Sequence, residues 1–233
     1  MITVRNNFRK QKDEIELYYN FLDEIINHDA RLVIDPPNDT IKIIKVETIA
    51  ILKSSFFLML YNCVESTVAN CLRAILREIE SDGCKYNDLI DELQIAALAA
   101  YDYNVEKCES KDDKNKCMKQ QIDFQTGLSV FHLDLKSLMA SSSQGNFSGS
   151  LDAKEIRKIF SRLALDLSPM RCDELVKIKE CRNKLAHGEV SFEEYGRDYS
   201  IQYLQVSKDH TLTYLDDLIS NVDHYLTSKG YRR

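Results

Sequence analysis

The longest hydrophobic pattern of the chain extends from about residue 47 to residue 80. Apolar side chains recur there every three or four positions, and neither glycine nor proline interrupts them. The stripe comprises Ile49, Leu52, Phe56, Leu60, Val64, Val68, Cys71, Ile75 and Ile79. This period predicts an amphipathic helix, which at 1.5 Å per residue is roughly 50 Å long. A helix of that length can form the spine of a bundle.

Several shorter segments have a helical period and flanking residues typical of helix ends. They are residues 5–30, 88–100, 151–167, 171–186 and 200–228. Asp152 and Ser200 are expected to cap the helices that follow them, and Gly188 is expected to end the helix at 171–186. The sequence TIKIIKVE at 40–47 is rich in β-branched residues. It fits either a short strand or the first turns of the long helix, and we favour the helix.

We expect a single domain over residues 1–233. An N-terminal helix and linker at 1–37 precede a core at 38–233, and that core contains a variable polar segment at about 101–130. Residues 104–120 have almost no apolar content, so they fit a solvated loop or an exposed helix face. The sequence SSSQGNFSGS at 141–150 is typical of a flexible connection.

Composition supports an all-α bundle of long helices. Only 7 glycines and 3 prolines occur among 233 residues, which is too little turn chemistry for an all-β fold or a series of βαβ units. No run of about 18 uncharged apolar residues is present, and the N-terminus lacks a secretory pattern, so we expect a cytoplasmic protein that does not span a membrane.

Seven cysteines are present, and none is paired in a C-x-x-C spacing. A disulfide scaffold and a zinc knuckle are therefore not expected, and a reducing compartment is the default. Cys108 and Cys117 lie in the polar segment at a spacing that matches no metal site. Glycine-rich phosphate loops, G-x-S-x-G and H-E-x-x-H are all absent from the sequence.

Positive charge is concentrated in one part of an acidic chain. The net charge is −6, yet residues 154–184 contain nine basic and five acidic side chains, so the rest of the chain carries −10. Lys177, Lys179, Arg182 and Lys184 fall within eight positions and are followed by His187. Such a cluster fits a phosphate-bearing ligand. It also fits solvated lysines with a histidine that complements a helix C-terminus.

The six residues from Arg182 to His187 (RNKLAH) resemble the R-x4-6-H motif of the HEPN superfamily, in which a polar residue follows the arginine. So short a motif also occurs by chance, and the surrounding sequence carries the resemblance. The matching strings are RNKLAHG, SSFFLMLYNCVESTVANCLRAI at 54–75, SGSLDAKEIRKIF at 148–160 and SFEEYGRDYS at 191–200. Together they are similar to bacterial HEPN-like nucleases of about this length, and residues 101–130 match least.

This resemblance implies an all-α bundle that forms a homodimer, with a composite cleft built from the motif of each protomer. Many members are metal-independent endoribonucleases of toxin–antitoxin or antiphage systems, and their activity is controlled by an antitoxin or another regulatory partner. Others have lost the motif and act as binding modules. The present chain retains the arginine, the polar residue and the histidine. The resemblance thus implies a nuclease that acts on RNA.

The motif residues suit cleavage of RNA by its own 2′-hydroxyl without a metal or a cofactor. His187 has a side chain that can transfer a proton at neutral pH, and Arg182 offers a planar, permanently charged fork to the phosphorane oxygens. Asn183 fits a role in orienting the imidazole or holding the ribose, and it equally fits an ordinary helix surface. One motif supplies one histidine for two proton transfers, which is a physical reason to expect a dimer.

Four further residues are weaker candidates. Glu65 is a carboxylate within the apolar long helix, so it either orients the arginine or histidine or occupies an exposed position. Lys177, Lys179 and Lys184 are candidates for binding RNA phosphates or are plain solvated lysines. The alternatives to a nuclease are a catalytically silent module that binds RNA, a nucleotide or a partner protein, and a purely structural adaptor.

Overall fold

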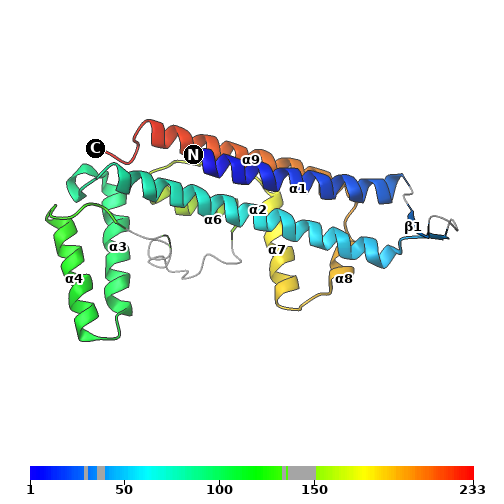
Figure 1. Cartoon of the computed structure of the whole chain (residues 1–233), viewed down its shortest axis with the longest axis horizontal. Coiled ribbons are helices and arrows are strands. Elements are labelled where there is room, and N and C mark those ends of the chain that lie inside the picture. Colours follow the sequence, from blue (N-terminus) through cyan, green and yellow to red (C-terminus); the bar gives the residue numbers. More distant parts are fainter. Residues whose placement is uncertain (29–30, 36–39, 133–134, 136–150) are drawn as a thin grey trace.

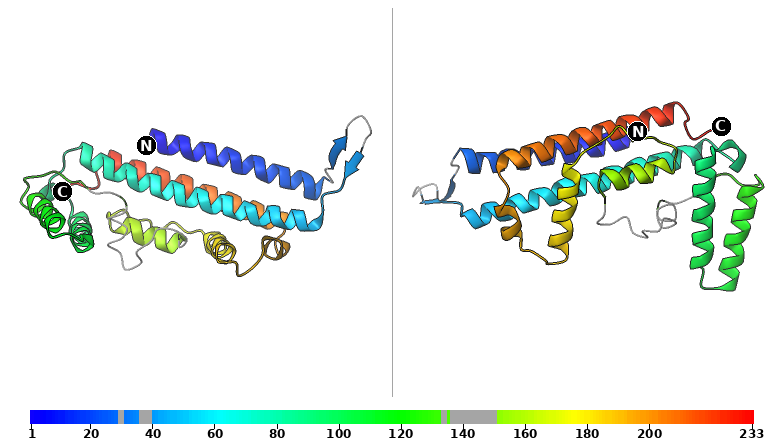
Figure 2. Two further views of the ribbon diagram at one scale, coloured as in Figure 1. Left: turned by 60° about the horizontal axis from the view of Figure 1, so that its bottom comes forward. Right: turned by 180° about the vertical axis from the view of Figure 1, so that it is seen from behind.

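The computed structural model describes residues 1–28, 31–35, 40–132, 135 and 151–233. Three long helices, α1 (Ile2–Asn27), α2 (Val46–Ser81) and α9 (Ile201–Thr227), lie lengthwise beside one another. Figure 2 shows the same three helices from two other sides, with α2 next to both α1 and α9. The fold is all-α, as the sequence predicts, and the long central helix spans nearly the expected residues.

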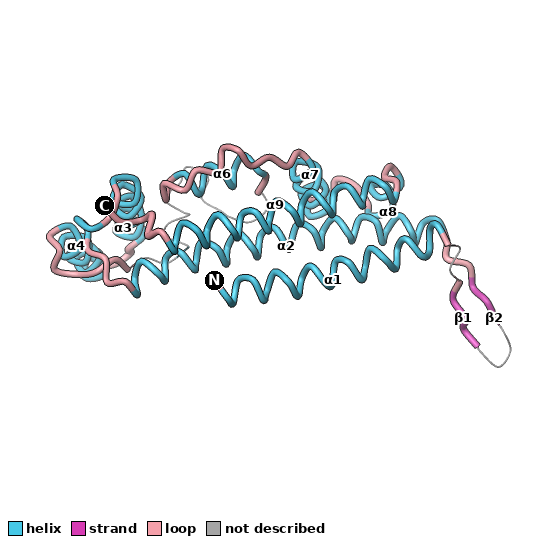
Figure 3. The backbone as a smooth tube through the Cα atoms, turned by 90° about the horizontal axis from the view of Figure 1, so that it is seen from above, coloured by secondary structure: helices cyan, strands magenta, loops and turns pink. Residues whose placement is uncertain are grey.

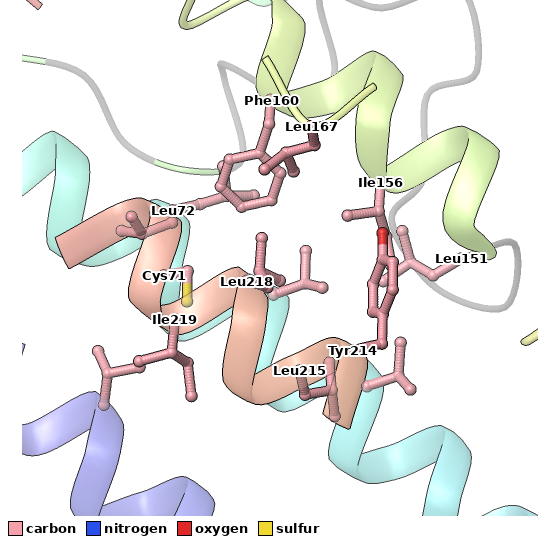
Figure 4. Packing of buried hydrophobic residues seen from close by; sticks show 14 of the residues in the cluster. Cys71, Leu72, Leu151, Ile156, Phe160, Leu167, Tyr214, Leu215, Leu218 and Ile219 are labelled. Carbon is pink, nitrogen blue, oxygen red and sulfur yellow. The ribbon is translucent and has the colours of Figure 1, made fainter. Parts of the chain in front are cut away.

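The core forms around α2. Its fully buried side chains include Phe56, Phe57, Leu60, Val64, Val68, Cys71, Leu72, Ile75 and Ile79. In Figure 4, Leu72 and Cys71 of α2 lie next to Leu218 and Ile219 of α9, and Phe160 and Ile156 approach from α6 (Ala153–Ser161). By length and composition α2 is long and apolar enough to cross a membrane. However, it packs against α1, α7, α8 and α9, which is the pattern of a core helix.

A short hairpin joins α1 to α2. Strand β1 (Leu32–Asp35) pairs antiparallel with β2 (Thr40–Lys42), and Figure 3 shows the pair beyond the ends of the two helices. Our preference for helix at 40–47 is therefore wrong for residues 40–45, since residues 40–42 form β2 and α2 begins only at Val46. The β-branched residues of this segment favour an extended backbone, and β1 pairs with that extended backbone. Residues 36–37, the last of the N-terminal helix and linker expected at 1–37, lie outside the described residues.

Two helical projections leave the same side of the long helices (Figures 1 and 2). One consists of α3 (Asp91–Lys107) and α4 (Lys111–Gln125), preceded by the short 3-10 helix η2 (Tyr86–Asp88). The other consists of α7 (Glu174–Ala186) and α8 (Phe192–Arg197). The turn between α7 and α8 lies at the outer end of its projection in Figure 1. The C-terminal end of α7, where the motif ends at His187, therefore extends away from the three long helices, which form the body of the molecule.

Most predicted helix ends are confirmed. The Ser200 hydroxyl and the Asp152 carboxylate accept hydrogen bonds from backbone N–H groups of the first turns that follow them, as predicted. The Ser110 hydroxyl caps α4 in the same way, which the sequence did not predict. The prediction of a helix through 167 is wrong, because α6 ends at Ser161 and Ala164 adopts a positive φ of 53°. The polar residues 111–125 form the exposed helix α4, whose only buried residue is Phe124. The expected flexible connection at 141–150 lies outside the described residues.

Candidate active site

Helix α7 carries the motif and is fixed to the body by its N-terminal two-thirds. Leu175, Ile178 and Cys181 are buried on the side that faces α2 and α9. The C-terminal end of α8 packs on α2 so closely that a Cβ on Gly196 would lie 1.9 Å from the Ala50 carbonyl oxygen. The Ser54 hydroxyl also donates to the Phe192 carbonyl at 2.6 Å. These contacts fix the base of the α7–α8 projection.

The helix ends at His187, in the way the sequence predicts. The N–H of Gly188 donates to the Leu185 carbonyl at 3.2 Å, and the N–H of Glu189 donates to the Lys184 carbonyl at 2.9 Å. Gly188 has a φ of +68°. This pair of bonds is a Schellman motif, which requires a left-handed residue directly after the C-cap. His187 is that C-cap, and its side chain is exposed.

Arg182 lies deeper, about one turn before Ala186, the last residue of α7. Its guanidinium carbon is 5.7 Å from the centre of the Tyr61 ring, and its Nη1 donates to Asn183 Oδ1 at 3.3 Å. A guanidinium over an aromatic face is attracted by the ring quadrupole. Arg182 is half-buried, so its orientation is set by the surface of α2 rather than by solvent.

Tyr61 connects Arg182 with Glu65. Its hydroxyl accepts from the Leu151 N–H at 3.3 Å and makes a side-chain hydrogen bond with the Glu65 carboxylate. Burial raises the pKa of Tyr61 to about 12, and Glu65 adds to the rise while the Leu151 N–H and Arg182 oppose it. The phenol is consequently neutral at pH 7 and donates to Glu65. From the sequence, a position near the motif was one of two alternatives for Glu65. In the structure Glu65 contacts Tyr61, and Tyr61 contacts Arg182.

Tyr61 is a residue of this site that was not predicted from the sequence. The available signal was its spacing, because Tyr61 and Glu65 are four residues apart on the long helix and therefore share a face. Asn183 is also half-buried, and its side chain contacts Arg182 while its carbonyl accepts from the His187 N–H at 3.0 Å. The structure thus brings Arg182, Asn183, Tyr61 and Glu65 together. His187 is attached to this group through the helix backbone.

The three lysines differ in their surroundings. Lys184 is exposed, and Lys177 is exposed but pairs with Glu180 at 3.1 Å, which raises the pKa of the Lys177 ammonium. Lys179 forms an ion pair with Asp152, the N-cap residue of α6. Burial opposes the charge on Asp152, but the Lys179 ammonium and backbone N–H groups outweigh it and lower the pKa of that carboxyl. Lys179 therefore has a structural contact that joins α7 to α6.

Tyrosines line the other side of α7. The Tyr195 hydroxyl donates to the Lys177 carbonyl at 3.3 Å, and the Tyr199 hydroxyl donates to the Tyr195 oxygen at 3.1 Å. Their rings and that of Tyr203 stand about 5.2 Å apart in succession, with Phe57 of α2 behind them. These tyrosines pack the projection onto the body. Elsewhere, Tyr19 and Tyr101 are buried and belong to the core.

Among the described residues, no three His, Cys, Asp or Glu side chains are grouped so that they could hold a metal ion. The chemistry available at the motif is that of a guanidinium, an amide, a phenol with its carboxylate partner, and an exposed imidazole. A fixed cation beside a group that transfers protons is the combination that phosphodiester chemistry requires.

Residues 3–231 match the HEPN_MAE_28990-like HEPN family, and the chain belongs to that family. Comparison with curated proteins and with solved structures gives no significant match. The matched range extends over nearly the whole chain and includes both projections. Membership in this family indicates a nuclease-like or otherwise RNA-related function.

Proposed function

We propose that the chain is an endoribonuclease that cleaves RNA through attack of the 2′-hydroxyl on the adjacent phosphorus. The observation that carries this proposal is the contact of Arg182 with Tyr61, which holds the guanidinium on the same helix that ends in the exposed His187. The arginine is fixed before substrate arrives, so its charge stabilises the phosphorane without further ordering.

In this mechanism the side chains of the motif and its neighbours have different roles. His187 removes the proton of the 2′-hydroxyl or protonates the departing 5′-oxygen. Arg182 hydrogen-bonds the non-bridging oxygens of the phosphorane. Asn183 and the ring of Tyr61 hold the guanidinium, and Glu65 binds the Tyr61 hydroxyl. Lys184 and Lys177 provide exposed positive charge for neighbouring phosphates. The products are a 2′,3′-cyclic phosphate and a free 5′-hydroxyl, and a strand lacking the 2′-hydroxyl is not cleaved.

The isolated chain supports a composite site in a homodimer. The His187 imidazole makes no hydrogen bond or ion pair within the part of the chain that the structure describes, so nothing there orients it. The turn that carries it lies at the outer end of a projection, where a second copy has access to it (Figure 1). A paired motif would supply two histidines and two arginines to one phosphate. Specific activity should then fall on dilution below the dimer dissociation constant, and a fully active monomer would contradict the composite site.

We propose a role as a toxin or antiphage effector held inactive by a regulatory partner. The alternative is a silent HEPN module that binds RNA, a nucleotide or a protein, and the unoriented His187 is the observation that favours it. Two ligands separate these functions: RNA, and the same strand with a 2′-deoxy residue at the cut site. For a nuclease, His187→Ala should abolish turnover of RNA and leave the affinity for the deoxy strand within about twofold. A silent module would bind both strands equally and cleave neither.

A further inference from the structure

The end of α3 and the first half of α4 bring two cysteines into contact. Cys108 is the C-cap of α3 and Cys117 lies in α4, and their sulfurs are 3.3 Å apart. The Cys108 Sγ also lies 3.2 Å from the Asn104 carbonyl oxygen. These residues belong to the polar segment in which the sequence spacing matched no metal site. The α3–α4 turn, rather than the sequence separation, creates the pair.

The other five cysteines are in a different environment. Cys63, Cys71, Cys84, Cys172 and Cys181 are buried, whereas Cys108 and Cys117 are partly exposed. Burial raises the pKa of the Cys63 thiol to about 11 and those of Cys71, Cys172 and Cys181 to about 12. Such thiols are almost entirely protonated at neutral pH and therefore react slowly. An oxidant in solution thus has access to one pair of thiols in contact.

The backbone around the pair allows the two sulfurs to approach further. A disulfide bond is about 2.0 Å long, so the sulfurs need to close by only about 1.3 Å. Cys108 has φ −69° and ψ 122°, which places it outside the helical conformation at the end of α3. A small rotation there does not break α3, and the cap of α4 by the Ser110 hydroxyl is separate from it.

We propose that Cys108 and Cys117 form a reversible oxidation site, at which a peroxide converts the two thiols into a disulfide that ties the end of α3 to α4. This inference stands independently of the proposed nuclease function. It concerns the projection formed by α3 and α4, which is separate along the chain from the α7–α8 projection (Figure 1).

The reaction follows from the hydrogen bond between the two sulfurs. The Cys108 S–H donates to the Cys117 sulfur, and this bond, followed by burial, raises the pKa of Cys108. One thiol of the pair, as the thiolate, attacks the peroxide, breaks its O–O bond, releases hydroxide and becomes a sulfenic acid. The other, as the thiolate, then attacks that sulfur and expels a second hydroxide. In total, two thiols lose two electrons and two protons, and hydrogen peroxide is reduced to two molecules of water.

The test uses the full-length, reduced protein and hydrogen peroxide as the probe. Trypsin cleaves after Lys107, Lys111, Lys116 and Lys119, so it releases the two cysteines on separate peptides, 108–111 and 117–119. We expect a linked pair of these peptides, lighter by two hydrogens than their sum, to appear after oxidation and to vanish after treatment with dithiothreitol. Limited trypsinolysis of the native protein at Lys111 to Lys116 should slow at the same time.

Three variants make the outcome decisive. Cys108→Ser and Cys117→Ser should each abolish the linked peptide, whereas Cys172→Ala removes a buried thiol and should leave it unchanged. Titration with Ellman's reagent before unfolding should show two fast thiols in the reduced protein, one in each serine variant and none after oxidation. Linkage of Cys108 or Cys117 to any other cysteine, or to a second chain, would overturn the proposal. So would fast thiols that persist in the folded, peroxide-treated protein.

Discussion

The guanidinium carbon of Arg182 lies 5.7 Å from the centre of the Tyr61 ring, so a residue of the motif on α7 is held against the central helix α2. Tyr61 in turn binds the Leu151 N–H and the Glu65 carboxylate through its hydroxyl. The ring and the hydroxyl therefore have separate functions. The ring positions the arginine, and the hydroxyl links α2 to the residue that precedes α6.

Two substitutions at Tyr61 separate these functions. Tyr61→Phe keeps the ring but leaves the buried Leu151 N–H without its acceptor, so we expect a loss of about 1–2 kcal/mol in the free energy of unfolding and near wild-type kcat/KM. Tyr61→Leu also removes the cation–π contact, worth about 1 kcal/mol, and should lower kcat/KM by about fivefold. Urea unfolding and initial rates measure both. Equal kcat/KM for the two variants would show that the ring does not position Arg182.

Gly196→Ala should destabilise the protein severely. The added Cβ would lie 1.9 Å from the Ala50 carbonyl oxygen and 3.0 Å from Ser54 Oγ, so α8 must move away from α2. Overpacking of this kind costs about 1–3 kcal/mol or more. The control is Gly83→Ala, where nothing lies within 4 Å and only the positive φ of 63° is unfavourable, at about 1 kcal/mol. Thermal unfolding of both variants checks the ranking, and a smaller effect at Gly196 would contradict the close packing.

The turn after His187 depends on glycine. Gly188 has a φ of +68° and open space around it, so Gly188→Ala is strained by its backbone alone, by about 1–2 kcal/mol. Asparagine tolerates this conformation better, and Gly188→Asn should lose less. Because the turn fixes the backbone from which the His187 side chain extends, RNA cleavage should fall in the order glycine, asparagine, alanine. Cleavage rates of the three proteins, compared at equal folded fraction, test this order. Equal rates would show that the turn does not contribute to catalysis.

The ion pair between Lys179 and Asp152 gives stability that depends on pH. Lys179 and backbone N–H groups lower the pKa of Asp152 in the folded state, so the pair stabilises the protein above the unfolded pKa of the carboxyl, near 4. This contribution is lost as the pH falls through the lower, folded value. Lys179→Met should therefore cost about 1–3 kcal/mol at pH 7 and much less at pH 2–3. Urea midpoints at both pH values measure the difference, and an equal loss at each would exclude an electrostatic origin.

The same variant also tests how RNA is bound. Lys179 is paired with Asp152, whereas the Lys184 ammonium is exposed and makes no ion pair or hydrogen bond among the described residues. Lys184→Met should weaken RNA binding and reduce its dependence on salt by about one phosphate contact. Lys179→Met should leave the salt dependence unchanged where the protein is folded. A larger effect at Lys179 would mean that the ion pair opens when RNA binds.

Local pattern was sufficient to predict the helices that carry strong signals. The unbroken stripe of α2, the Ser200 cap of α9 and the Gly188 stop of α7 are each determined by residues close together in sequence. Helix α8 was not predicted, although Ser191 and Glu194 form a capping box, which is typical of the start of a helix. It has six residues, which is too short for a periodic pattern to emerge.

Contacts between distant segments could not be predicted in this way. The placement of Tyr61 beside Arg182, and of Lys179 beside Asp152, depends on how α7 crosses α2 and α6. The two sulfurs of Cys108 and Cys117 meet because α3 and α4 form a hairpin, which the polar sequence at 104–120 does not specify. For the same reason the sequence identified the motif residues but not what holds them.

Cleavage of end-labelled RNA in excess EDTA tests the central claim most directly. Wild type is compared with His187→Ala, and with His132→Ala as the matched control, since His132 is another exposed histidine but pairs with Glu80 on the body. We predict that wild type and His132→Ala leave 2′,3′-cyclic phosphate ends and that His187→Ala does not cleave. Absence of cleavage by a folded wild-type dimer freed from any partner, or undiminished cleavage by His187→Ala, would contradict the account.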